Sequence, residues 1–165
     1  MYAGGSFMIY VVLIGLMAAI DLFLKNQIEK QDPNDFPRPL AHTKEKILLY
    51  HNHNAGFPFG FLQKYGTVVR MVPLTVVSGL AGVLCYLIRK PGKNLQKFSL
   101  AMITGGALSN LYDRFARRYV VDYFSFQLGP LKKVVFNIGD LCVFLGSGIL
   151  MVREIVKEVR GYCKK

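Results

Sequence analysis

Asp122 and Asp140 are the residues of this sequence best suited to do chemistry. Each lies within an apolar segment, and the two segments are separated by roughly the length of one membrane-spanning helix. Placing a carboxylate at membrane depth costs free energy, so such a residue is treated as functional until another role is shown. Two such carboxylates that meet across a helix interface form an acid/base pair, which predicts a hydrolase working within or at the edge of a bilayer.

The chemistry of such a pair follows from the repulsion between its two charges. Two carboxyl groups a few Å apart cannot both ionise, so one stays neutral and donates a proton while the other accepts one. The ionised member takes a proton from water as it attacks a peptide carbonyl, and the neutral member protonates the oxyanion and then helps the amine leave. The alternative is that Asp122 and Asp140 each pair with a Lys or Arg to hold helices together. The amides beside both aspartates favour the catalytic interpretation.

Polar residues lie near both aspartates in the sequence. Asn137 precedes Asp140 by three residues, so on a helix its amide would lie on the same face and orient that carboxylate. Asn110, Asp113 and Arg114 fall in the last turn of an apolar segment. Asp113 is a rival for a place in the pair, and spacing alone does not exclude it. Its neighbour Arg114, which also suits a backbone carbonyl or a lipid phosphate, favours a structural ion pair for Asp113.

Other polar and small residues have simpler interpretations. Asp21 and Lys25 have the i, i+4 spacing of a salt bridge at the end of a helix. The run 105–107, Gly-Gly-Ala, predicts a small-residue face that lets helices approach closely. These features indicate packing roles.

The segment 51–60 contains His51 and His53 at i, i+2, which suggests a metal site at first sight. Without a nearby carboxylate or cysteine this pattern is weak, and we expect no metal ion and no cofactor. We interpret the segment as a turn at the membrane surface, with its aromatic residues at the headgroup level and Asn54 pointing into the site.

The composition of the chain predicts that membrane helices position the aspartates and their polar neighbours. The chain has 165 residues, 52% of them hydrophobic, and a net charge of +11. Its Lys and Arg residues fall mostly between apolar runs, which suits binding to anionic lipid and argues against nucleic acid as a partner. We expect one all-α membrane-embedded domain, residues 1–165, with four transmembrane helices at about 7–24, 67–88, 98–112 and 136–152.

The distribution of charge predicts the orientation. The loop Arg89–Lys97 has four positive and no negative residues, and the segment after the fourth span is also basic. By the positive-inside rule both belong in the cytoplasm, together with both termini. The longer first loop is nearly balanced in charge and can lie outside, which places the aspartates toward the outer leaflet.

Several ordered blocks of sequence resemble the lipoprotein signal peptidase family, the type II signal peptidases of bacteria, over nearly the whole chain. The resemblance rests on these blocks: Asp21-x-x-x-Lys25, Asn54-x-Gly56, Gly105-Gly106-Ala107-x-x-Asn110-x-x-Asp113-Arg114, Val120-Val121-Asp122-Tyr123 and Phe136-Asn137-x-x-Asp140.

The resemblance implies a four-span aspartic endopeptidase of the bacterial cytoplasmic membrane, working as a monomer. It implies removal of signal peptides from prolipoproteins, on the N-terminal side of a diacylglyceryl-modified cysteine. By the same resemblance the catalytic pair is Asp122 and Asp140. Asn54, Gly56 and the other polar residues of the blocks would shape the site and contact substrate (Asn110, Arg114 and Asn137), and a small β-rich platform with a mobile lid is expected at about 36–61.

The chain departs from the family pattern at four positions. Ser109 stands where Gly is usual, Arg118 where Gly is frequent, and Tyr123 where Phe is common. Gly139 replaces the Ala commonly found before the second aspartate, and a looser backbone there is expected to loosen the positioning of Asp140. None of the four changes removes a functional group.

Two other functions fit an intramembrane pair of acids. A small proton-coupled transporter would use the aspartates as a relay, but no repeat relates the two halves of the sequence. A non-catalytic assembly or lipid-binding protein would have a decayed site, whereas every polar residue of the pattern is present. Both alternatives are weaker than the hydrolase.

Overall fold

The protein is mostly helical, with a small antiparallel sheet. The computed structural model describes residues 3–57 and 60–162, with side chains from residue 7 onward. Its α-helices are α1 (Ala3–Glu29), α2 (Gly66–Ile88), α3 (Asn94–Ala116) and α4 (Ile138–Tyr162). The sheet consists of β1 (Arg38–Pro39), β2 (Ile47–Asn54) and β3 (Val120–Phe126), in the order β1-β2-β3. Short 3-10 helices, η1 (Pro33–Asp35) and η3 (Gly129–Lys133), lie in the connections.

The predicted spans overlap the four helices, but the fourth was predicted to begin at residue 136, two residues before α4, and three of the helices are longer than the apolar runs. Helix α1 continues beyond residue 24 to Glu29, α3 extends past residues 98–112 at both ends, and α4 begins at Ile138 and continues to Tyr162. The additional turns are rich in Lys, Arg, Glu and Gln, which are good helix formers. Hydropathy identifies only the apolar part of a helix, so it underestimates the length of the helix.

Helix α3 is the centre of the bundle and packs against each of the other three helices. Its glycines make this possible. A Cβ on Gly105 would lie 3.0 Å from the Cβ of Met17 and 3.1 Å from the carbonyl oxygen of Ile14, both on α1. A Cβ on Gly106 would overlap the carbonyl oxygen of Gly139 on the other side of α3. The predicted small-residue packing is therefore present on two faces of one helix.

Two of the described helices are long and apolar enough to cross a membrane by length and composition, Phe7–Glu29 and Gly66–Ile88. Helices α3 and α4 are of similar length, with 23 and 25 residues, but carry more polar residues. Large apolar side chains nevertheless point outward on α4, where Phe144 is 60% and Met151 62% exposed. Apolar surface of this extent is unusual for a protein surrounded by water.

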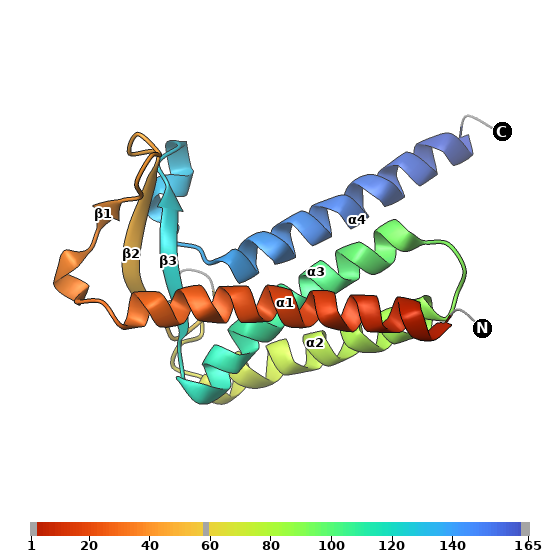
Figure 1. The fold of residues 1–165 in the computed structure, drawn as a ribbon, viewed down its shortest axis with the longest axis horizontal. Helices are drawn as coiled ribbons and strands as arrows, with labels where there is room; N and C mark the ends of the chain where they lie inside the picture. Colours follow the sequence, from red (N-terminus) through yellow and green to blue (C-terminus); the bar gives the residue numbers. More distant parts are fainter. Residues whose placement is uncertain (1–2, 58–59, 163–165) are drawn as a thin grey trace.

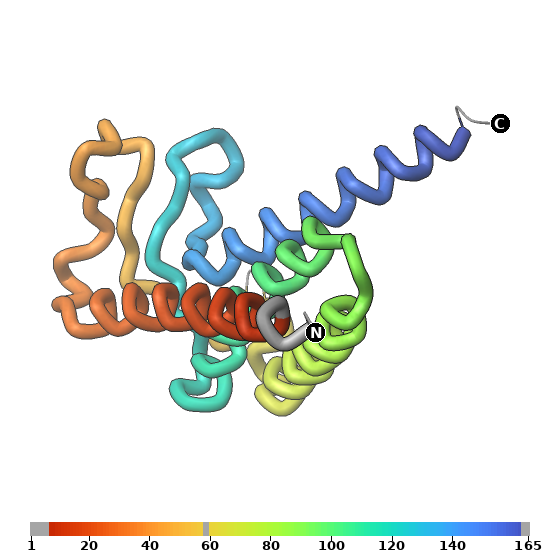
Figure 2. The backbone as a smooth tube through the Cα atoms, turned by 45° about the vertical axis from the view of Figure 1, so that its right-hand side comes forward, coloured from red at the N-terminus to blue at the C-terminus, as the bar shows by residue number. Residues whose placement is uncertain are grey.

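The sheet lies at one end of the helices, and the first turns of α1 and the last turns of α4 lie at the other (Figure 1). The view in Figure 2 shows the same arrangement, with α4 leaning away from α1 and α2. Strand β3 packs through Val121, Tyr123 and Phe124 against Ile28 near the end of α1. The sheet is thereby held against the bundle at the end of α1.

The β-rich platform differs from the expectation in one respect. Strands β1 and β2 fall within the predicted range 36–61, but the third strand, β3, comes from the connection between α3 and α4. The register places Asn52 opposite Asp122 and Asn54 opposite Val120. Residues His51–Asn54, predicted as a turn, are the last residues of β2, because their pairing partner is distant in sequence. Pro58 and Phe59, which belong to the same predicted turn, lie outside the described residues.

Candidate active site

The two aspartates meet where the sheet joins the bundle. Asp122 lies in β3 and its side chain is buried, with 5% of the residue exposed. Asp140 lies in the first turn of α4. The expectation that they meet across an interface between helices is wrong, because the segment containing Asp122 pairs with β2 and forms a strand.

Asn137 connects the two carboxyl groups. Its side-chain amide donates to Oδ1 of Asp122 at 2.8 Å, and its backbone N–H donates to Oδ2 of Asp140 at 3.2 Å. In return the backbone N–H of Asp140 donates to Oδ1 of Asn137 at 2.8 Å. The reciprocal pair of bonds at this spacing is a capping box, which fixes the start of α4.

The role of Asn137 therefore differs from the prediction. Its amide orients Asp122, whereas we expected it to orient Asp140 from the same helical face. The reason is that Asn137 precedes the first residue of α4 and does not lie on the helix surface. The Asn-x-x-Asp spacing of a capping box is the signal in the sequence that could have shown this.

Two further asparagines hold the outer oxygens of the pair. The Asn54 amide donates to Oδ2 of Asp122 at 3.3 Å, and the Asn110 amide donates to Oδ1 of Asp140 at 2.9 Å. The amide oxygen of Asn110 accepts a hydrogen bond from the Lys25 ammonium at 2.7 Å, and that of Asn54 accepts from the backbone N–H of Gly56 at 3.0 Å. Both amides are thus held at both ends, so their donors face the carboxyl groups.

Lys25 occupies a fully buried position behind the pair. Its ammonium lies 2.9 Å from Oδ2 of Asp21 and 3.0 Å from Oδ2 of Asp113, and all three side chains are inaccessible to solvent. The salt bridge predicted from the Asp21–Lys25 spacing forms, but in the interior and not at the helix end. Asp113 also lies 3.3 Å from the Arg117 guanidinium and accepts from the backbone N–H of Val121 at 3.2 Å. These contacts turn Asp113 toward Lys25 and Val121.

Of the partners that the sequence left open for Arg114, the structure shows backbone carbonyl groups and not Asp113. The Arg114 guanidinium donates to the carbonyl oxygens of Asn110 and Gly56, at 3.3 Å each. Gly56 has no space for a side chain, because a Cβ there would lie 2.7 Å from the carbonyl oxygen of Phe61. Arg114 therefore holds the turn that follows Asn54 against the end of α3.

Three of the four departures from the family pattern surround Asp21. The hydroxyl of Ser109 donates to Oδ2 of Asp21, and the hydroxyl of Tyr123 donates to Oδ1 at 3.1 Å. The Tyr123 oxygen also accepts the backbone N–H of Ile138 at 3.1 Å, at the start of α4. Sequence reasoning treated Ser109 and Tyr123 as isolated substitutions, whereas the structure makes them part of one buried network.

Gly139 also contacts this network. A Cβ at this position would lie 2.7 Å from the carbonyl oxygen of Gly106, 2.9 Å from Oδ2 of Asp21 and 3.0 Å from Oδ1 of Asn137. We expected this glycine to loosen the backbone before Asp140. The close contacts contradict that expectation, because the backbone is packed tightly where Gly139 lies.

We therefore expect Gly139→Ala to impair this protein although alanine is the residue that the resemblance favours here. The added methyl group would displace the backbone of Gly106 or the side chain of Asp21, at a cost of about 1–3 kcal/mol, and would move Asp140. The prediction is a lower midpoint of thermal unfolding, followed by circular dichroism in detergent, together with a lower kcat. Gly148→Ala on the same helix is the control, since nothing lies within 4 Å of a Cβ there. Equal behaviour of the two variants would contradict the packing argument.

The electrostatics of Asp122 are those of a buried acid. Burial, and next the neighbouring Asp140 carboxylate, raise the pKa of Asp122 from 3.8 to about 7, although the Asn54 and Asn137 amides oppose the shift. At neutral pH Asp122 therefore holds a proton in a large share of the molecules. The pair can thus supply an acid and a base together.

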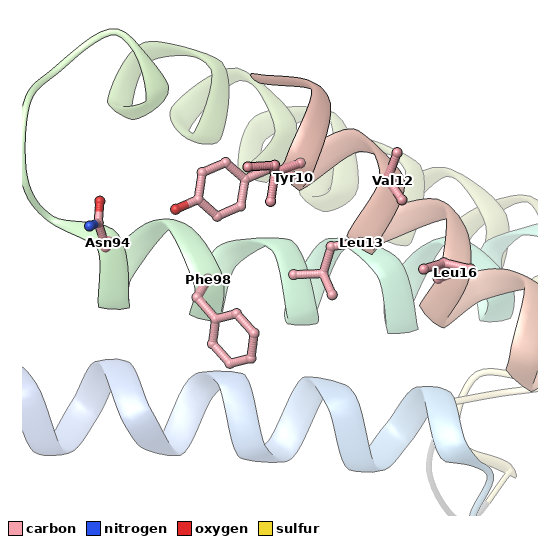
Figure 3. A pocket seen from close by; sticks show the side chains of 7 residues that line it. Tyr10, Val12, Leu13, Leu16, Asn94 and Phe98 are labelled. Carbon is pink, nitrogen blue, oxygen red and sulfur yellow. The ribbon is translucent and has the colours of Figure 1, made fainter. Parts of the chain in front are cut away.

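Two apolar hollows lie along the helices and contain neither aspartate. One lies between α1 and the start of α3 (Figure 3), lined by Ile9, Tyr10, Val12, Leu13, Leu16, Asn94 and Phe98. The other lies between α1, α2 and α3, lined by Ala18, Leu22, Leu74, Leu108, Leu111, Tyr112 and Phe115. Neither hollow is lined by a carboxyl group, which the chemistry of the pair needs.

His51 and His53 have a carboxylate beside them, contrary to the expectation from the sequence. Oε1 of Glu29, the last residue of α1, lies 2.8 Å from Nε2 of His53 and 3.7 Å from Nε2 of His51. The residues are distant in the sequence, so no local spacing could reveal the cluster.

Comparison with known proteins places these features in a family. The sequence profile described as "Signal peptidase (SPase) II" matches residues 13–156. The lipoprotein signal peptidase of Burkholderia vietnamiensis (strain G4 / LMG 22486) is 36% identical over 116 residues, covering 70% of this chain and 68% of that protein. The lipoprotein signal peptidase of Burkholderia mallei (strain SAVP1) is 34% identical over 110 residues, covering 66% of each.

Solved structures share the fold. A bacterial membrane enzyme determined by the in meso method at 2.3 Å resolution superposes with a TM-score of 0.77 at 18% identity, covering 90% of this chain and 88% of that one. A second, at 1.9 Å resolution, gives a TM-score of 0.72 at 18% identity, covering 87% of this chain and 90% of that one.

Proposed function

The chain belongs to the signal peptidase II family of proteases, and from this we propose that it removes signal peptides from diacylglyceryl-modified bacterial prolipoproteins. It cleaves on the N-terminal side of the lipidated cysteine, with Asp122 and Asp140 as the catalytic pair. The observation that carries this proposal is the link through Asn137, whose amide bonds one carboxyl group while its backbone N–H bonds the other.

The mechanism uses the two carboxyl groups in opposite protonation states. Asp122, whose pKa is raised to about 7, holds the shared proton. Asp140 is the base, and its charge is stabilised by the Asn110 amide, the backbone N–H of Asn137 and the N-terminal end of α4. Asp140 takes a proton from water as the water oxygen bonds to the scissile carbonyl carbon, while Asp122 protonates the carbonyl oxygen. The tetrahedral intermediate then expels the amine, which receives the proton held by Asp140, while Asp122 recovers a proton from a hydroxyl group of the intermediate as the carbonyl re-forms.

The surrounding polar residues position the pair and the substrate. Asn54, Asn110 and Asn137 fix the carboxyl oxygens, and Arg114 with Gly56 forms the edge of the site toward the sheet. Asp21, Lys25 and Asp113 are structural, since their contacts are with each other and with the groups that hold the asparagines.

We further propose that the whole chain is one domain of four transmembrane helices. Helices of 23 and 25 residues, such as α3 and α4, reach about 35 Å at 1.5 Å per residue, enough for the hydrocarbon core. The basic segment 89–97, which includes the first residues of α3, lies at the end of the bundle that holds the chain termini, opposite the sheet (Figure 1). Cytoplasmic termini therefore place the catalytic pair toward the outer leaflet, and the enzyme is expected to act as a monomer.

The direct test is cleavage of a diacylglyceryl-modified prolipoprotein by the purified protein in detergent with EDTA present. Mass spectrometry of the products should show a new N-terminus at the lipidated cysteine. A substrate that carries the same sequence without the lipid should be cut poorly. If the folded, purified protein did not cleave the lipidated substrate, the proposed function would be refuted.

The pH dependence of cleavage follows from the protonation state of the pair. The working form carries one proton, and Asp122 releases it as the pH rises through about 7, after which no acid remains. We expect kcat/KM to fall about tenfold per pH unit above that value. The folded state loses the stability contributed by protonated Asp122 as the pH rises from about 4 to about 7, below the range in which the rate falls, so circular dichroism at each pH is the control. A rate that stays flat up to pH about 9, with the protein folded, would contradict the assignment.

A further inference from the structure

The cluster of Glu29, His51 and His53 lies outside the catalytic site and is not used by the proposed mechanism. His51 and His53 project from the same face of β2, two residues apart, and Glu29 ends α1. The imidazole nitrogens and the carboxylate oxygen all lie within 4.8 Å of one another. The three side chains can therefore reach one common point.

We propose that these three side chains bind a divalent transition-metal ion of the zinc type. Bonds of about 2.0–2.2 Å to imidazole nitrogen and carboxylate oxygen place tetrahedral ligand atoms somewhat more than 3 Å apart. The separations from Glu29 Oε1, 2.8 Å to His53 and 3.7 Å to His51, lie on either side of that value. Two histidines and one carboxylate are also a known zinc ligand set, with water as the fourth ligand.

The neighbouring residue Tyr119 holds the ligands in place. Its hydroxyl donates to Oε2 of Glu29 at 2.9 Å, which leaves Oε1 facing the histidines. Its ring stacks on the ring of His53, with centroids 3.9 Å apart. Outer contacts of this kind orient metal ligands and raise affinity. His53 is 41% exposed, so an ion can enter from the surface.

The ion would join two elements that matter to the catalytic site. It would tie the end of α1 to the end of β2, where Asn54 follows His53 directly and donates to Asp122. The proposed role is therefore structural or regulatory, and it takes no part in peptide-bond cleavage.

Metal titration of the tag-free protein in detergent tests the proposal without depending on cleavage. After treatment with EDTA and removal of the chelator, Co²⁺ should give saturable visible absorption bands of a tetrahedral site, and Zn²⁺ should displace it at one equivalent per chain. Zn²⁺ should also raise the midpoint of thermal unfolding, because it binds the folded state.

The variants His51→Asn, His53→Asn and Glu29→Gln are each expected to weaken Co²⁺ binding by at least about tenfold. His42→Asn is the matched control, because His42 is an exposed histidine on a different segment and its backbone φ of 65° accepts Asn. Absence of a saturable band, or equal binding by the control and the cluster variants, would overturn the proposal and leave Glu29 as a hydrogen-bond partner of His53 and Tyr119.

Discussion

Replacing either Asp122 or Asp140 by Asn is expected to reduce cleavage of the lipidated prolipoprotein by at least about 1,000-fold. Asn has nearly the shape of Asp, so the hydrogen bonds from Asn54, Asn110 and Asn137 can be largely retained while the carboxyl group is lost. The Asp122→Asn protein lacks the acid, and the Asp140→Asn protein lacks the base. The KM should change much less than kcat, because neither residue is proposed to supply most of the substrate binding.

The control for this pair is Asp35→Asn, an exposed aspartate in η1. It should cleave at the rate of the unmodified protein. Circular dichroism should show that all three variants fold. An Asp122→Asn protein that remained active would exclude Asp122 from the catalytic pair and return attention to Asp113.

Replacing Lys25 by Met is expected to cause the largest loss of stability of any single substitution considered. Lys25 lies between the carboxylates of Asp21 and Asp113, at 2.9 Å and 3.0 Å, and no part of its side chain reaches solvent. Removing the ammonium leaves Asp21 with neutral hydroxyl donors and no cation, and leaves Asp113 with Arg117 as its remaining cation, at a cost of about 3–5 kcal/mol. The unfolding midpoint in detergent should fall by on the order of 10 °C. Circular dichroism is the appropriate probe, because the sequence contains no Trp.

Lys97→Met is the matched control for the loss of a buried lysine. Lys97 is only 4% exposed, but its ammonium donates to the carbonyl oxygen of Lys90 and does not neutralise a carboxylate. Its removal should therefore cost much less. The double variant Lys25→Met/Asp21→Asn should recover part of the stability, since the buried carboxylate that has no other cation is then neutral. Equal midpoints for the two single lysine variants would refute the ion-pair argument.

The helices were predictable because their signals are local. Apolar runs of bilayer length located all four helices, and the i, i+4 spacing identified the Asp21–Lys25 pair. The small-residue run at Gly105 and Gly106 gave the close packing of α3. Each of these signals needs only neighbours within a few turns of one helix.

The parts that were not predicted depend on contacts between distant segments. Asp122 lies on a strand because β3 pairs with β2, which is far away in the sequence. Glu29 meets His53 only because the sheet packs on the end of α1. The tight environment of Gly139 is set by α1 and α3, and the sequence around Gly139 alone suggested a looser backbone. Antiparallel pairing of a short strand leaves little local pattern to detect.

The position of Asp140 in the capping box of the last helix has a consequence for biogenesis. A nascent chain that has emerged as far as Asp122 possesses half of the pair, and the groups that align it arrive only with Asn137 and α4. Proteolytic competence should therefore be the final event of membrane insertion. Until the last helix docks against Gly106, the proposed catalytic pair is incomplete and no cleavage is expected.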